Sequence, residues 1–405
     1  MDFMRRSAIA LTLGALGAVA AATWSSVATR RTGSVEGLRD RNTRRSAARI
    51  STTSRGDLDR TVATMNERLN RNPSDAAAAV ALADALLRQT RVTGNAGLAS
   101  RAESALKAVL ADEPIDYGAR RMLAAVYLSQ HRFGDAIREA DRCRTMRARD
   151  AWLEGVLGDA HLELGEYDAA FDAFDRMTAA RPDAASYARA SYARELQGDL
   201  AGALRLMRMA AEATPPQDPE SLAWHHAQLG HLYLEDGRIA EARREYQHAD
   251  YAFPGHPFAA EGLARVDAAA GDVESALARV QGILAASPTP SVLALAGDLL
   301  ARLGRADQAE RQYRLAEAAW RVDAPEPSRL ARFLATHDRS LDDAIRLADA
   351  SDRHDIFTDD ARAWAYFRRG DLPHAREAIA HALRTGSRDR DIRAHAAAIA
   401  RAVTK

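Results

Sequence analysis

The chain has 405 residues, of which 47% are hydrophobic and 28% are charged, and its 56 basic and 56 acidic residues leave a formal net charge of zero. This balance excludes a uniformly basic nucleic-acid-binding protein and a protein with a polyacidic tail. The single cysteine, Cys143, excludes an intramolecular disulfide framework and a zinc site built from several cysteines.

Residues 1–29 are predicted to be a signal peptide or a membrane anchor. Arg5 and Arg6 precede a stretch without charged residues that continues to Thr29, and a spanning helix needs roughly 20 residues. Ala, Gly, Ser and Thr dilute its apolar residues, and the alanines at 20–22 offer a cleavage site, so both interpretations stay open. The arginine pair is also an incomplete match to a twin-arginine export signal. Arginine counts on the two flanks favour a cytoplasmic body, whereas a cleaved signal places the body outside. We expect an exported or membrane-anchored protein, extracytoplasmic (periplasmic) rather than cytoplasmic.

Residues 30–56 are rich in Arg, Ser, Thr and Gly and are predicted to form a flexible linker. If the preceding segment is uncleaved, this linker lies next to the membrane, where its arginines could contact anionic lipid headgroups; a solvated tether is the alternative. The linker lacks the interleaved aromatic residues of a single-strand-binding segment, so we expect no nucleic-acid partner. Capping helices are predicted at 57–75 and 390–405, because the end units of a repeat array need a polar outer face.

Residues 76–389 consist of one helical pattern that recurs about nine times. Helix-forming residues dominate, with Gly, Pro and Asp at intervals. The clearest unit begins at Ala151, and its turn glycine Gly165 lies 72 residues before the matching Gly237 of a later unit, which is two periods of about 34 residues plus an insertion. The units begin near Ala76, Tyr117, Ala151, Ala184, Ala223, Pro257, Pro290, Pro325 and Ile356.

Small residues recur at fixed places in these units. Glycines such as Gly158, Gly230 and Gly297 fall in the first helix of a unit, where two antiparallel helices can approach closely only if side chains are small. Large residues such as Phe174 and Tyr246 are expected to fill the space between helix pairs. A glycine in the turn permits the left-handed backbone conformation that ends a helix.

In these positions the sequence resembles the tetratricopeptide repeat family. The resemblance implies an all-α fold, an α-solenoid of tandem helix-turn-helix repeats that form a right-handed superhelix with the first helices lining its concave wall. It also implies a non-catalytic scaffold that binds a protein or peptide segment in that groove. Two departures are an insertion at 215–221 and Arg339 in place of a turn glycine.

Motifs of catalysis are absent from the sequence. It contains no H-E-x-x-H, no P-loop and no G-x-S-x-G motif, so we expect no enzyme, no cofactor and no small-molecule substrate. His225, His226 and His231 are poorly spaced for a metal, and His248 and His256 add no ligand spacing, so no metal site is expected. The alternative function is an accessory subunit of an enzyme complex, or a weakly marked enzyme that uses groove carboxylates.

Projection of the first helices predicts the residues that face the groove. Aromatic residues with acids beside them would suit a peptide with apolar anchors and Arg or Lys. The alternative for the two tryptophans in the set is packing against the neighbouring repeat. The predicted binding residues are Trp152, Asp159, Glu163, Tyr192, Glu195, Trp224, His231, Glu235, Phe258 and Arg265.

Overall fold

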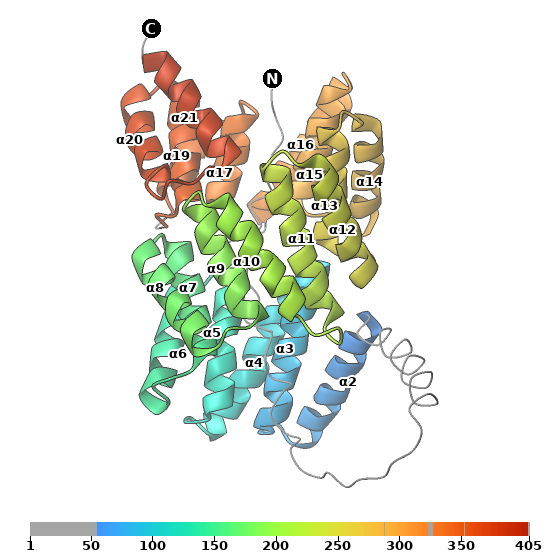
Figure 1. Ribbon diagram of the computed structural model, residues 1–405, viewed down its shortest axis with the longest axis vertical. Coiled ribbons are helices and arrows are strands. Elements are labelled where there is room, and N and C mark those ends of the chain that lie inside the picture. The colour runs from blue at the N-terminus through green and yellow to red at the C-terminus, as the bar shows by residue number, and fades with distance from the viewer. Residues whose placement is uncertain (1–54, 287, 323–326, 352, 404–405) are drawn as a thin grey trace.

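The computed structural model describes residues 55–286, 288–322, 327–351 and 353–403, and this part of the chain is an all-α solenoid (Figure 1). Consecutive helices pack as antiparallel pairs from α3/α4 to α19/α20, with α2 and α21 at the two ends. The helices are α2 (Arg55–Arg71), α3 (Ala76–Thr93), α4 (Gly97–Asp112), α5 (Tyr117–Ser129), α6 (Phe133–Met146), α7 (Ala151–Leu164), α8 (Tyr167–Ala180), α9 (Ala184–Leu196), α10 (Leu200–Ala213), α11 (Pro219–Glu235), α12 (Ile239–Ala252), α13 (Pro257–Ala269), α14 (Val273–Ala286), α15 (Pro290–Arg302), α16 (Ala306–Val322), α17 (Pro327–Thr336), α18 (Leu341–Asp349), α19 (Ile356–Arg369), α20 (Leu372–Ala382) and α21 (Arg390–Val403).

Residues with the right local chemistry mark the helix ends. Asp150 accepts a hydrogen bond from the backbone N–H of Trp152 at the start of α7, and aspartates cap several other helices in the same way. Pro257 and Pro290 occupy first-turn positions, where their missing N–H costs nothing. At the other end of α7, Gly165 adopts φ 81°, a conformation that residues with a Cβ rarely take.

The predicted close approach between paired helices is confirmed. A Cβ added to Gly158 or Gly297 would lie less than 3.0 Å from the ring of Phe174 or Tyr313, respectively, on the second helix of the same pair. Tyr246 fills the space between Gly230 of its own pair and Gly262 of the next. Real Cβ atoms essentially never make contacts this short, so a larger residue at any of these four positions would displace the aromatic ring.

The solenoid curls until distant repeats touch. Figure 1 shows α19 and α20 above α7 and α8, and the loop before α19 reaches the end of α7, where Arg353 pairs with Glu163 at 2.6 Å. The backbone N–H of Ile356 donates to the Tyr167 hydroxyl at 2.8 Å. At the other end of the array, Arg88 of α3 contacts a carboxylate at the start of α11 at 2.8 Å. The C-terminal repeats therefore pack on the turns of the third pair as well as on their sequence neighbours.

The predicted signal peptide or anchor (1–29) and nearly all of the predicted linker (30–56) lie outside the described residues, and α2 begins at Arg55. Within the described part of the chain, no helix is both long enough and apolar enough to cross a bilayer. Cys143 is buried in α6.

Candidate interaction surface

Three of the four aromatic residues predicted to line the groove are buried. Trp152 and Trp224 are each 5% exposed, and Tyr192 is 9% exposed. The guanidinium of Arg121, from the preceding pair, stacks 4.1 Å from the centroid of the Trp152 ring. This burial is what the packing alternative for the two tryptophans expects, and whether they bind a partner stays a prediction.

Asp159 lies inside the solenoid, in an ion pair with Arg189. The pair joins α7 to α9, both side chains are at most 2% exposed, and the Arg189 guanidinium donates to both carboxylate oxygens at 2.7 to 3.1 Å. Burial raises the pKa of Asp159, and the positive charge of Arg189 opposes that shift. A bidentate pair of this kind fixes the register between two neighbouring first helices.

Glu163 is held by the C-terminal repeats. Its carboxylate pairs with Arg353, and the same arginine donates from Nε to the backbone carbonyl of Glu163 at 2.9 Å. The two residues are 190 positions apart, so no local pattern in the sequence could have paired them.

The remaining predicted residues are half-buried and lie on three successive first helices, α9, α11 and α13. His231 of α11 lies 3.3 Å from Glu195 of α9, which connects these two helices. Along α13, Arg265 pairs with Glu261 at 2.6 Å. To these residues we add Glu261, the partner of Arg265, and call the set the first-helix strip. Its members are Glu195, His231, Glu235, Phe258, Glu261 and Arg265, and all are of intermediate exposure.

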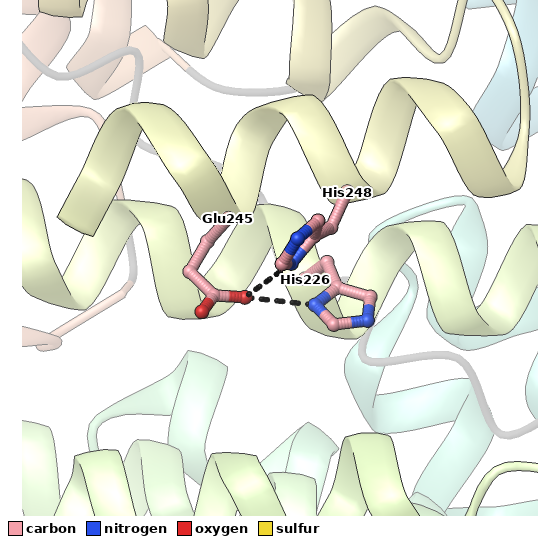
Figure 2. A group of neighbouring side chains, drawn as sticks. All are labelled: His226, Glu245 and His248. Carbon is pink, nitrogen blue, oxygen red and sulfur yellow. Dashed lines mark hydrogen bonds and ion pairs between the residues drawn. The ribbon is translucent and has the colours of Figure 1, made fainter. Parts of the chain in front are cut away.

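A second polar group lies between the two helices of the fifth pair. His226 of α11 and Glu245 and His248 of α12 each place one ligand atom within 4.8 Å of the others (Figure 2). Both imidazole Nδ1 atoms face the same oxygen, Oε2 of Glu245, at 2.8 Å for His226 and 3.7 Å for His248. Burial would raise the pKa of Glu245, but its interactions with the two histidines outweigh that effect and lower it.

No metal site was expected at these histidines, because their spacing within one helix does not suit a metal ion. The signal that could have found the group is the i, i+3 pair of Glu245 and His248, which places both on one face of α12. His226 reaches that face only through the packing of α11 on α12.

Comparison with known families confirms the resemblance to the tetratricopeptide repeat. Two family models described as tetratricopeptide repeat match residues 156–218 and 233–299. No curated protein matches the sequence.

Solved structures share the fold at low sequence identity. A chain from the crystal structure of the APC/C hetero-tetramer Cut9–Hcn1 superposes with a TM-score of 0.53 at 14% identity; the match covers 85% of this chain and 59% of that one. Human IFIT1 superposes with a TM-score of 0.53 in its dimer with PPP-AAAA and 0.54 in its dimer with m7Gppp-AAAA. Both matches have 16% identity and cover 82% of this chain, with 78% and 77% of the IFIT1 chains. These similarities show the α-solenoid fold.

Proposed function

We propose that this solenoid of tetratricopeptide repeats is a non-catalytic scaffold, and that its protein partner docks on the first-helix strip. The observation that supports this proposal is that α9, α11 and α13 each contribute half-buried polar side chains to the strip. The contact between His231 and Glu195 joins two of these helices. A half-buried polar side chain has an exposed part that a ligand can contact, while its interactions with neighbouring residues of the same chain fix its position.

The composition of the strip indicates the chemistry of the partner. Three carboxylates stand against one guanidinium, and Phe258 supplies an apolar surface beside them. A partner segment that carries Arg or Lys next to an apolar side chain would complement this surface. Trp152, Tyr192 and Trp224 are buried, so in this proposal they contribute to packing and do not contact the partner directly.

Partner capture with matched variants tests this assignment. The strip variant combines Phe258→Ala with Glu235→Lys. The control variant combines Tyr251→Ala with Glu212→Lys, which likewise remove one aromatic ring and reverse one charge, but at exposed positions of second helices; Tyr251 is 87% exposed. We expect a partner captured by the wild type and by the control to be lost from the strip variant at equal helicity. Loss from the control alone, or equal capture by all three proteins, would place the partner elsewhere.

We also propose that the body is exported or tethered to the membrane on the extracytoplasmic side. Support comes from the uncharged stretch between Arg6 and Arg30. N-terminal sequencing of the mature protein, together with protease treatment of intact cells, tests this proposal. A full-length N-terminus on a body that is protected inside the cell would overturn it.

A further inference from the structure

The cluster of His226, Glu245 and His248 has the donor chemistry of a metal site. Two imidazoles and one carboxylate are ligands that zinc and its neighbours in the first transition series accept. The donors come from both helices of the fifth pair, so an ion held there would bridge α11 to α12. His248 is 60% exposed at its side chain, whereas His226 and Glu245 are 22% and 20% exposed, which leaves one side of the cluster open to water.

The distances between the donor atoms suit a tetrahedral ion. With metal–ligand distances of about 2.0 to 2.1 Å, two ligands of a tetrahedral zinc lie about 3.4 Å apart. The two distances from histidine Nδ1 to Oε2 of Glu245, 2.8 and 3.7 Å, lie on either side of that value. All three ligand atoms lie within 4.8 Å of one another, so small side-chain rotations would bring them to one ion.

We propose that His226, Glu245 and His248 bind one divalent transition-metal ion, with zinc as the probe ion and water at the open fourth position. Three protein ligands with one open position are the arrangement of zinc sites that exchange a ligand. The site lies between the helices of one pair and uses no member of the first-helix strip, so it is independent of the proposed partner surface.

Other histidine–carboxylate pairs in the described part of the chain provide an internal control. His374 lies 2.7 Å from Asp371 at i, i+3 on an exposed surface, with a side-chain exposure of 61% that matches that of His248. This pair belongs to no group of three potential ligands among the residues that the structure describes. If any surface histidine beside a carboxylate bound zinc, removing His374 would matter as much as removing His248.

Calorimetric titration of the full chain with zinc chloride, after treatment with a chelator, tests the proposal. We expect one saturable ion per chain, with affinity reduced at least about tenfold in each of the variants His226→Ala and His248→Ala and unchanged in His374→Ala. Cobalt provides a second readout, because a bound tetrahedral Co²⁺ ion absorbs visible light, and that absorption should be lost in the same two variants.

Three results would overturn the proposal. They are the absence of saturable binding, wild-type affinity in both ligand variants, and an equal loss in His374→Ala. Because His226 is partly buried, its variant is checked for helicity; if it unfolds, Glu245→Gln replaces it, since glutamine keeps the shape of glutamate and removes the charged ligand. His248 is mostly exposed, so its truncation should leave the fold intact whatever the other variants do.

Discussion

The contact between the third and ninth helix pairs can be tested at a single glycine. Gly165 ends α7 with φ 81°, and a Cβ added there would lie less than 3.0 Å from the backbone carbonyl of His354. Gly237 ends the first helix of the fifth pair with φ 73° and has no atom within 4 Å of an added Cβ. Both substitutions to alanine carry the cost of a left-handed residue, about 1–2 kcal/mol. Of the two, only Gly165→Ala also creates a steric clash with the C-terminal repeats, at the carbonyl of His354.

The size of the excess follows from the bonds that the displaced loop would lose. A backbone carbonyl cannot rotate away as a side chain can, so the loop must move. That movement breaks the ion pair between Arg353 and Glu163, worth about 1.5–3 kcal/mol as a charged hydrogen bond, and the bond from Ile356 to Tyr167, worth about 0.5–1.5 kcal/mol. We therefore expect Gly165→Ala to destabilise the docking of the C-terminal repeats by about 2–4 kcal/mol more than Gly237→Ala destabilises its own turn.

Hydrogen exchange measured by mass spectrometry separates this local effect from global unfolding. Peptides that cover α19 to α21 should exchange faster in Gly165→Ala than in Gly237→Ala, while peptides from α3 to α6 should be unchanged in both variants. Equal exchange of α19 to α21 in the two variants would refute the contact and the superhelical curl that produces it.

Three further predictions follow from local packing and charge. Gly158→Ala overpacks a buried phenylalanine ring, whereas Gly282→Ala gains helix propensity in open space. Urea titration should therefore give a free energy of unfolding about 1–3 kcal/mol lower for Gly158→Ala than for Gly282→Ala, and equal urea midpoints would contradict this. Burial opposes ionisation of Asp150, but hydrogen bonds from a tyrosine and an arginine of α5 lower its pKa. Asp150→Asn should therefore cost about 1–3 kcal/mol at pH 7, and this loss should shrink progressively as the pH falls below about 4 and through the lowered pKa of the folded state; a loss that stays constant as the pH falls through that range would contradict the charge argument. Burial raises the pKa of Cys143 to about 11, so iodoacetamide at pH 8 should label the native thiol at least about a hundredfold more slowly than the unfolded one; similar rates would contradict its burial.

The helical class and the repeat family could be predicted because their determinants are local. Gly158 and Phe174 are 16 residues apart, within one unit, and the same pairing of a small and a large residue recurs in later units. The turn glycines likewise act on their own helix ends, as the φ of 81° at Gly165 shows. Such features need only the antiparallel helix pair, which the sequence specifies unit by unit.

Contacts around the superhelix could not be predicted, because they depend on small rotations that accumulate over several repeats. The pairing of Arg353 with Glu163 is one result of this accumulation. Projection of α7 as a wheel with one free face also failed to anticipate that Asp159 is closed off by Arg189 from the next first helix. The cluster of His226, Glu245 and His248 depends in the same way on how α11 packs against α12, and the spacing of residues in the sequence does not predict that packing.

Site-specific photo-crosslinking is the most direct test of whether a partner docks on the first-helix strip. A photoreactive phenylalanine analogue is placed at Phe258, in the strip, and in a separate protein at Tyr251, on the exposed face of α12. We predict that a protein partner becomes covalently attached to the analogue at position 258 and not to the analogue at position 251. Attachment from position 251 alone, or from neither position while the partner still co-purifies with both proteins, would contradict it.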